Sequence, residues 1–412
     1  MKRILAAAMS MLLLLSGCGT KAQAIDGDLM KDIKGTGGDT HADITGEEAV
    51  AVTDFGARLL QSCLTPGQNV LVSPLSVISA LAMTANGAAG ETLAQMESVF
   101  GVSMDELNAY LRDYAAALPS KEGGRTHVAN GIWFNADGDL AVERDFLQCN
   151  ADYYGAGAYE KPFDDALKDE INVWVKEHTE GRIEEILDTL SPGAMMYLVN
   201  ALAFDGIWED IYREDQVQSG VFTTDHGEDR DVEMMYSTEN VFLRDENATG
   251  FVKYYADRGY AFAALLPNEG VSVSDYAATL TGQRIQDILE NASEDFYVNA
   301  AIPKFSCKFG AELSAALSAM GMKDAFDPER ADFSRICQNP PGNLHISRVL
   351  HKTFVNVDEK GTQAGAATAV EIRAAGLLGP EQMVHLDRPF VYMIIDCQAN
   401  VPIFLGVTAD IG

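Results

Sequence analysis

The sequence predicts one large domain of the α+β class. No Pro/Gly/Ser-rich linker interrupts the chain after residue 46, although 412 residues could form two or three domains. Helical and strand patterns both recur along the chain, with no internal repeat. Residues 195–208 are nearly all apolar, which is typical of a strand covered on both faces. These features favour strands and helices packed around one core.

The N-terminus carries the pattern of an exported protein. Lys2 and Arg3 precede an apolar run from Ile4 to Leu15, which is too short to span a membrane comfortably, so residues 1–17 are predicted to be a signal peptide. The protein is therefore expected to be extracytoplasmic.

The signal ends in Leu15-Ser16-Gly17-Cys18, which resembles a bacterial lipobox. Cys18 would then become a lipidated N-terminus that anchors the protein to a membrane or cell surface. The alternative is ordinary signal-peptide cleavage, in which Cys18 has no special role. A lipid-anchored protein could also be released later from the surface. Residues 18–45 lack apolar periodicity and are predicted to be a flexible tether, so the folded domain would span residues 46–412.

The net charge restricts the expected partners, and the cysteine spacing argues against a metal site. The chain has 61 acidic and 30 basic residues, so a phosphate backbone would be repelled and nucleic acid is not expected as a partner. The acidity suits a secreted, soluble protein and could attract cationic proteases. Six cysteines show no CxxC or other metal-binding spacing, and the five that remain without Cys18 are predicted to be free thiols. No cofactor or metal is expected.

Elements in the first half follow from caps and periodicity. Ser73-Pro74 marks a helix start, and Ser103 with Glu106 forms a capping box. The expected helices begin near residues 47, 74 and 103, with a further amphipathic helix over 171–187, and the expected strands cover 69–72 and 128–135.

In the second half, short apolar runs alternate with helical patterns. The expected strands cover residues 195–208, 260–267, 296–305 and 345–358, and the expected helices cover 274–291 and 311–322. Two further apolar runs follow residue 387.

Residues 357–389 form an unusually long connection between two strands, which in a compact domain indicates a function. From Gly361 to Ala369 every residue except Gln363 is Gly, Ala or Thr. Such small residues anchor a loop poorly, but they pass easily between neighbouring strands. If about a dozen residues entered a sheet, hydrogen bonds of roughly 1 kcal/mol each would contribute on the order of 10 kcal/mol. That rivals the stability of a whole domain, so the chain would be metastable until the loop is cut.

These residues resemble a known family. DEKGTQAGAATAV (358–370) resembles the hinge of the serpins, and DRPFVYMII (387–395) with IFLGVTAD (403–410) resembles their C-terminal strands. Residues 69–96, Trp174 and residues 179–182 are similar to further serpin motifs, so the resemblance covers about residues 46–412.

The resemblance implies a serpin fold, with three β-sheets, about nine helices and an exposed reactive-centre loop. It also implies a monomeric, irreversible suicide-substrate inhibitor of serine proteases, which traps its target as a covalent acyl-enzyme when the loop inserts into the main sheet. Such a protein is not an enzyme, and no Ser/His/Asp or Cys/His motif is present in the sequence.

The resemblance assigns two polar sites in the sheet. Ser73, Ser76, Asn200 and His351 match the shutter beneath the centre of the main sheet, although on their own residues Ser73 could be a helix cap and His351 a buried strand histidine. Trp208, Lys304 and Glu359 match the breach, where the loop first enters; Lys304 and Glu359 are expected to pair as a latch, and Trp208 could equally be a core aromatic.

The hinge is the segment that distinguishes an inhibitory serpin from a non-inhibitory binding protein. A charged or bulky residue would resist insertion, whereas this chain has small ones and departs from the family only mildly, at Gln363. The hinge residues are Gly361, Thr362, Gln363, Ala364, Gly365, Ala366 and Ala367.

The cleaved bond is placed by spacing within the family. Counting forward from the hinge gives Ala375-Gly376, which suits the small pocket of an elastase- or subtilisin-like protease. Arg373 would suit a trypsin-like pocket, and Leu377 or Leu378 a chymotrypsin-like one. Inhibition of a cysteine protease and a non-inhibitory binding lipoprotein are the alternative functions.

Overall fold

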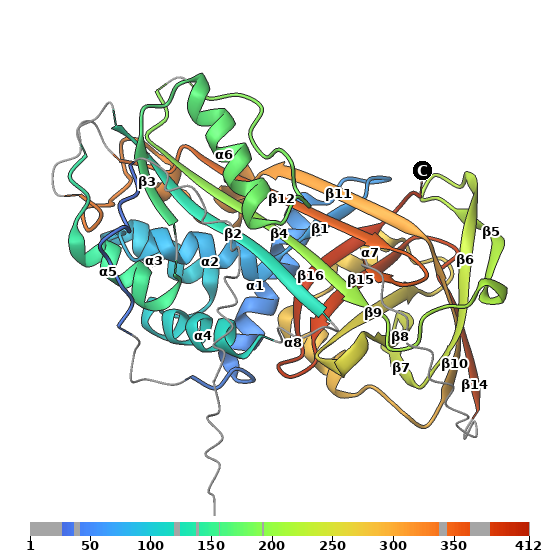
Figure 1. Ribbon diagram of the computed structural model, residues 1–412. Helices are drawn as coiled ribbons and strands as arrows, with labels where there is room; N and C mark the ends of the chain where they lie inside the picture. The colour runs from blue at the N-terminus through green and yellow to red at the C-terminus, as the bar shows by residue number, and fades with distance from the viewer. Residues whose placement is uncertain are drawn as a thin grey trace, which may run out of the picture.

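The computed structural model describes residues 27–36, 42–118, 124–136, 140–155, 157–191, 193–337, 344–362 and 380–411. Over these ranges the chain forms nine α-helices and three β-sheets (Figure 1). The helices are α1 (Glu47–Cys63), α2 (Pro74–Ala85), α3 (Gly90–Phe100), α4 (Met104–Ala117), α5 (Arg144–Tyr153), α6 (Asp165–His178), α7 (Val273–Ala278), α8 (Gly282–Glu290) and α9 (Ser314–Met320).

The first sheet, here called the central sheet, has six strands in the order β11-β12-β13-β4-β2-β3, with β12 also paired to β4. Its strands are β2 (Gly124–Asn135), β3 (Gly157–Lys161), β4 (Met196–Ile207), β11 (Phe305–Glu312), β12 (Arg348–Val357) and β13 (Gly361–Thr362).

The third sheet lies at the end of the molecule opposite helices α3 to α5, and the second sheet lies between it and α1 (Figure 1). The second sheet has the order β1-β16-β15-β9-β8-β7, and the third has β14-β10-β6-β5. The second sheet contains β1 (Val70–Val72), β7 (Val241–Arg244), β8 (Ala248–Tyr254), β9 (Tyr260–Pro267), β15 (Phe390–Asp396) and β16 (Val401–Thr408). The third contains β5 (Val217–Thr223), β6 (Asp229–Glu239), β10 (Tyr297–Pro303) and β14 (Glu381–His385).

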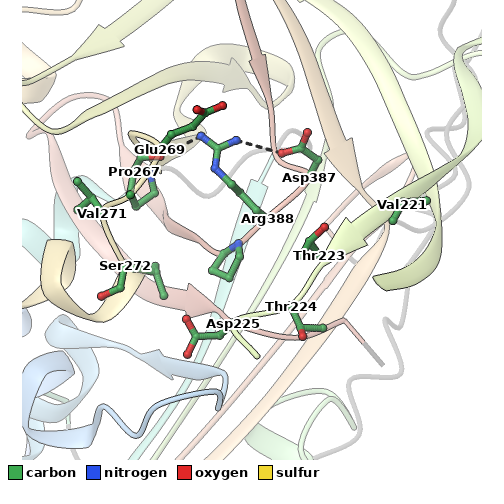
Figure 2. A pocket seen from close by; sticks show the side chains of 13 residues that line it. Val221, Thr223, Thr224, Asp225, Pro267, Glu269, Val271, Ser272, Asp387 and Arg388 are labelled. Atoms are coloured by element: carbon green, nitrogen blue, oxygen red, sulfur yellow. Dashed lines mark hydrogen bonds and ion pairs between the residues drawn. The ribbon is translucent and has the colours of Figure 1, made fainter. Parts of the chain in front are cut away.

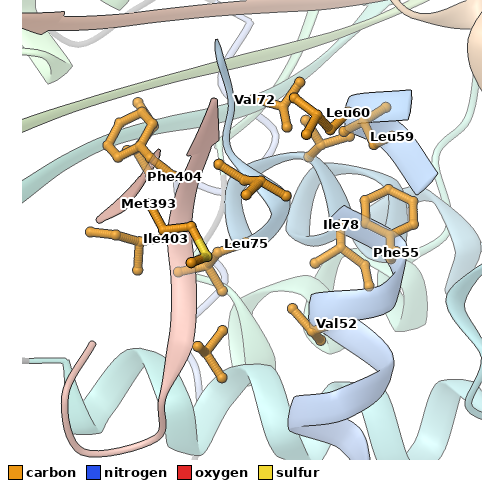
Figure 3. Packing of buried hydrophobic residues seen from close by; sticks show 14 of the residues in the cluster. Val52, Phe55, Leu59, Leu60, Val72, Leu75, Ile78, Met393, Ile403 and Phe404 are labelled. Carbon is orange, nitrogen blue, oxygen red and sulfur yellow. The ribbon is translucent and has the colours of Figure 1, made fainter. Parts of the chain in front are cut away.

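The central sheet is covered on both faces, as the apolar run of β4 predicts. On one face α2 packs between β4 and β16, and the main core continues through α1 and the second sheet. Figure 3 shows part of this core, in which Phe55 of α1, Ile78 of α2, Met393 of β15 and Phe404 of β16 belong to one buried cluster. Helix α6 crosses the other face and packs on a separate cluster that includes Trp133 and Trp174 (Figure 1).

Most predicted elements are present, and the capping signals of α2 and α4 are confirmed. The Ser73 side chain accepts from the Ser76 backbone N–H, and Ser103 with Glu106 forms a capping box. The five cysteines in the described ranges are free, as predicted.

Two predicted helices have the wrong limits. The helix predicted over 171–187 is α6, which ends at His178, because Glu180 and Gly181 take positive φ angles of 48° and 79°. The helix predicted over 274–291 is two helices, α7 and α8, because the Thr281 side chain caps a new helix by accepting from the Arg284 backbone N–H. Strands β3, β5 to β8, β11 and β14 and helices α3 and α5 were not predicted. Strand β11 does alternate apolar and polar residues, but its end was assigned to the helix predicted over 311–322, which in the structure is α9 and begins at Ser314.

The predicted tether differs from the structure over residues 27–36. This segment lies along the edge strand β3, where the Leu29 N–H donates to the Ala158 carbonyl at 2.9 Å and the Glu160 N–H donates to the Gly27 carbonyl at 2.9 Å. Leu29, Met30 and Ile33 pack against the main core. Three apolar side chains and a free strand edge therefore fix a segment that composition alone marks as flexible. Cys18 and the predicted signal peptide lie outside the described residues.

Among the described residues, none of the helices combines the length and the hydropathy required to cross a membrane.

Candidate functional site

Strands β4 and β12 meet in a parallel seam at the centre of the sheet. They pair directly from Arg348 with Tyr197 to Phe354 with Ala203, over seven residue pairs. Beyond these pairs the two strands separate, and β13 lies between them. A sheet that is closed at one end of the seam and open at the other has a built-in place for an additional strand.

The first two hinge residues already occupy the open end. Gly361 pairs with Ile207 and Thr362 pairs with Gly206, antiparallel to β4. Thr362 also pairs antiparallel with Val357 of β12. A Cβ on Gly361 would lie 1.9 Å from the Gly206 carbonyl oxygen, so only glycine permits this approach. The hinge therefore begins inside the sheet.

Thr362 is fully buried, and its hydroxyl bonds to the hydroxyl of Tyr255. Tyr255 stacks on Trp208 with ring centroids 4.4 Å apart. The Trp208 indole N–H donates to the Asp358 carbonyl at 2.9 Å, and its backbone N–H donates to the Lys360 carbonyl at 2.9 Å. The structure thus places Trp208 at the base of the loop, where it is both a core aromatic and a direct contact of the turn before the hinge.

The second predicted breach contact is also present. Lys304 Nζ lies 2.9 Å from Glu359 Oε2 and 3.2 Å from Glu233 Oε2. Burial alone would lower the pKa of Lys304, but hydrogen bonds to Glu359 and Glu233 raise it. The side chains of Lys304 and Glu359 are 26% and 37% exposed, so the pair contributes under about 1 kcal/mol and mainly orients the turn.

The four shutter residues form one hydrogen-bonded cluster beneath the seam. His351 of β12 and Asn200 of β4 are register partners, and His351 Nδ1 lies 2.7 Å from Asn200 Oδ1. The Ser73 backbone N–H donates to His351 Nε2 at 3.2 Å, so the ring proton is assigned to Nδ1 and donated to Asn200. The Asn200 amide donates to Ser76 and, at 2.7 Å, to Asn130 Oδ1 of β2. The cluster joins three strands to the start of α2.

Complete burial lowers the pKa of His351 to about 3, so the imidazole is neutral at physiological pH. Its two nitrogens bond to the Ser73 backbone N–H and to the Asn200 side chain, so the hydrogen bonds that the described residues make to the ring do not involve a hydroxyl. His351 is therefore a structural link across the seam and not a general base. A strand can enter between β4 and β12 only after the bond from His351 to Asn200 breaks.

The chain after α6 crosses the seam on the opposite face. Arg182 binds Asp205 of β4, with Nη2 and Oδ2 2.6 Å apart. On the other side of the seam, Lys352 and Arg348 of β12 donate to the backbone carbonyls of Glu185 and Thr189, respectively. This crossing segment therefore holds the two seam strands from outside, as the shutter does from inside.

A surface pocket near the third sheet is separate from these residues. Figure 2 shows its lining from β5, the loop before α7 and residues 387–389, with Arg388 in the middle. The Arg388 guanidinium donates to the Pro267 carbonyl at 3.0 Å and to Asp387 Oδ1 at 3.1 Å, so its charge is already satisfied within the wall. None of the predicted site residues lines this pocket.

Much of the predicted loop lies outside the described residues. This applies to the hinge from Gln363 to Ala367 and to the candidate cleavage residues Arg373, Ala375, Gly376, Leu377 and Leu378. The described chain leaves the central sheet at Thr362 and resumes at Pro380, next to β14 of the third sheet. The loop therefore connects two different sheets.

A family model described as serpin (serine protease inhibitor) matches residues 50–411. The chain belongs to the serpin family. Its fold is the predicted serpin fold, with three sheets and, in the described residues, nine helices.

Curated relatives of this serpin include proteins of mammals and of Thermococcus kodakarensis. It is 29% identical over 386 residues to Serpin B10 of Bos taurus, covering 86% of this chain and 96% of the relative. It is 30% identical to a serpin-like protein of Thermococcus kodakarensis, covering 86% of this chain and 84% of the relative. It is 28% identical to leukocyte elastase inhibitor A of Mus musculus, covering 86% and 97%.

Solved structures extend the comparison. The native state of the thermophilic serpin tengpin is 44% identical, with a TM-score of 0.88 over 93% of this chain and 99% of that one. Human thyroxine-binding globulin complexed with its hormone is 25% identical, with a TM-score of 0.80 over 89% and 99%. Leukocyte elastase inhibitor A is named as an inhibitor, whereas thyroxine-binding globulin is named as a binding protein, so relatives of both kinds share this fold.

Sequence reasoning missed four residues at this site: Asn130, Glu233, Tyr255 and Lys253, whose ammonium lies 5.5 Å from the ring centroid of Trp208. Asn130 had a signal, because it is a polar residue in the middle of a mainly apolar strand pattern, VANGIWFN. Glu233 and Tyr255 had none, since only the packing of three sheets brings them to the loop base. Lys253 was hidden because a lysine in a strand is normally exposed.

We expect His351→Asn to lower the melting temperature of the native protein at pH 7.5 and to make it less dependent on pH. Below the unfolded pKa of about 6.5, the unfolded chain takes up a proton that the buried imidazole refuses, so the free energy of unfolding falls as the pH falls. At pH 5 this loss is about 2 kcal/mol for the wild type and absent for the variant. Thermal scans at a fixed rate from pH 7.5 to 5 measure the difference.

The exposed His226→Asn is the control for the substitution itself and should follow the wild type at each pH. A gap between wild type and His351→Asn that stays constant with pH would contradict the neutral, buried imidazole.

Proposed function

We propose that this serpin is an irreversible, single-use inhibitor of serine proteases, with an elastase- or subtilisin-like target. The protease attacks the loop, with Ala375-Gly376 as the favoured bond, and forms an acyl ester. The freed hinge then extends β13 down the seam and carries the protease away before water hydrolyses the ester. The small Ala375 fits a small specificity pocket, and the likeness to leukocyte elastase inhibitor A supports the same class.

The position of β13 carries this proposal. Extending β13 replaces one parallel ladder between β4 and β12 with two antiparallel ladders, because β13 is antiparallel to both strands. Antiparallel pairing is slightly more stable per residue, and the number of ladders doubles. About a dozen added residues at roughly 1 kcal/mol each give on the order of 10 kcal/mol. That is enough to drive the displacement of a bound protease.

A non-inhibitory binding role is the second candidate in this fold. The described hinge favours inhibition over it, because Gly361 and Thr362 are small and already lie in the sheet.

We further propose that Cys18 carries the lipid anchor and that the domain acts outside the cytoplasm. The support is the sequence from Leu15 to Cys18 after the short apolar run. The acidic chain, with a net charge of −31, would attract cationic proteases to that surface.

Mixing the wild-type protein with an elastase-like protease should give a covalent complex that resists SDS. Thr362→Arg should abolish the complex and leave the protein a cleaved substrate, since a guanidinium cannot be buried where Thr362 lies between β4 and β12. Electrophoresis of the mixture measures both outcomes.

Thr362→Ser, which keeps the hydroxyl and the small volume, is the matched control and should still form the complex. Complete cleavage of the wild type without any complex would overturn the inhibitory mechanism.

Cutting the loop with a protease that is not trapped should raise the melting temperature sharply, because the hinge can then complete its strand. The cut and uncut proteins are compared by thermal unfolding. An unchanged melting temperature would argue against insertion.

Mass spectrometry of the peptide released from the complex should show a new N-terminus at Gly376. A fragment that begins at Ala374 would move the cleavage site to Arg373.

Expression of the full chain in a bacterial host should place it in the membrane fraction, whereas Cys18→Ser should be released in soluble form. Fractionation with immunoblotting distinguishes the two. Equal distribution of both proteins would rule out a lipid anchor on Cys18 and would leave the inhibitory proposal untouched.

A further inference from the structure

A charged pair is almost completely buried where the second and third sheets meet. Lys253 of β8 is 2% exposed, and its ammonium lies 2.9 Å from the carboxylate of Glu239 at the end of β6. Burial alone would lower the pKa of Lys253, but Glu239 outweighs it and keeps the amine charged. A buried charge needs compensation from neighbouring groups, and some of these neighbours also contact the turn before the hinge.

Two aromatic rings complete the surroundings of the ammonium. Lys253 Nζ lies 4.5 Å from the ring centroid of Tyr212 and 5.5 Å from that of Trp208, within the range of cation–π attraction. The Tyr212 hydroxyl is 3.2 Å from Ser237 Oγ, which donates to Glu239 at 2.6 Å. Ammonium, carboxylate, hydroxyls and rings thus form a closed network that fixes the orientation of both aromatic side chains.

The same two aromatic residues hold the turn before the hinge. The Tyr212 backbone N–H donates to the Glu359 carbonyl at 3.0 Å. Trp208 binds the carbonyls on either side of it, those of residues 358 and 360. Three consecutive carbonyls therefore depend on Trp208 and Tyr212, and Lys253 lies against both rings.

We propose that Lys253, with Glu239, is a positioning pair that keeps the start of the hinge ready to grow into a strand. The proposal rests on the inhibitory function proposed above. Starting a strand is entropically costly because several residues must be ordered before the ladder stabilises them. A turn that is already held in place removes part of this cost, so strand growth can begin as soon as the loop is cut.

The rate of insertion decides the fate of the protease. After acylation, insertion traps the protease, whereas hydrolysis of the ester releases it together with a spent inhibitor. If the turn is loosened, insertion slows while hydrolysis does not, so more inhibitor is consumed for each protease trapped. The first attack on the loop should be unaffected, because Lys253 is buried away from solvent.

The test is the double variant Lys253→Met/Glu239→Gln, which keeps the side-chain lengths and leaves no buried charge unpaired. It is assayed with a protease that the wild type traps. We expect the ratio of cleaved to trapped inhibitor to rise about fivefold, as for the loss of a desolvated cation–π contact. The rate constant of initial attack and the melting temperature of the loop-cut form should match the wild type.

Lys308→Met is the matched control, because Lys308 also lies over an aromatic ring, that of Phe354 at 5.4 Å, but is exposed on β11. Its ratio of cleaved to trapped inhibitor should be unchanged.

The outcomes separate the two proposals. An unchanged ratio in the double variant, including one accompanied by a lower native melting temperature, would overturn the positioning role and leave the inhibitory function standing. A wild-type protein that traps no protease would overturn both.

Discussion

The parallel pairing of β4 and β12 is the constraint on which the rest of this structure depends. Two parallel strands in the middle of a sheet are an incomplete arrangement when a segment of the same chain can lie antiparallel to both. In the proposed mechanism, the preference for insertion is thus a property of strand direction and not of any single side chain. The side chains would control the height of the barrier and where insertion starts.

The barrier to sheet opening and the point where insertion would start depend on different kinds of side chain. Along the closed seam, neutral and fully buried polar groups such as His351 and Asn200 give a contact that is either made or broken, since a half-satisfied buried hydrogen bond is costly. At the open end, charged and aromatic groups hold the turn before the hinge: Lys304 is partly exposed and Lys253 is buried, and acidic partners raise the pKa of both. The division places resistance to opening in the middle of the sheet and readiness to extend at its end.

Sequence reasoning recovered the parts of this arrangement that are local. The caps at Ser73 and Ser103 and the apolar run of β4 specify their elements through neighbouring residues alone. The shutter and breach residues were recovered through the resemblance to serpins, since contacts such as that between Ser73 and His351 join distant parts of the chain. The end of α6 was misjudged because an amphipathic pattern continues past Glu180, where the backbone turns to bind the sheet instead of completing the helix. The buried Lys253 escaped notice because its compensation comes from three separate elements.

The segment over residues 27–36 has one more consequence. A sheet able to accept a strand from its own loop is also exposed to strands from neighbouring molecules, above all along its outer borders. At β3 the border is already hydrogen-bonded to the chain's own N-terminal segment, on both sides of Tyr159. This short piece of chain, which does not contact the seam, thereby occupies hydrogen-bonding groups on that flank with which a strand of another molecule could otherwise pair.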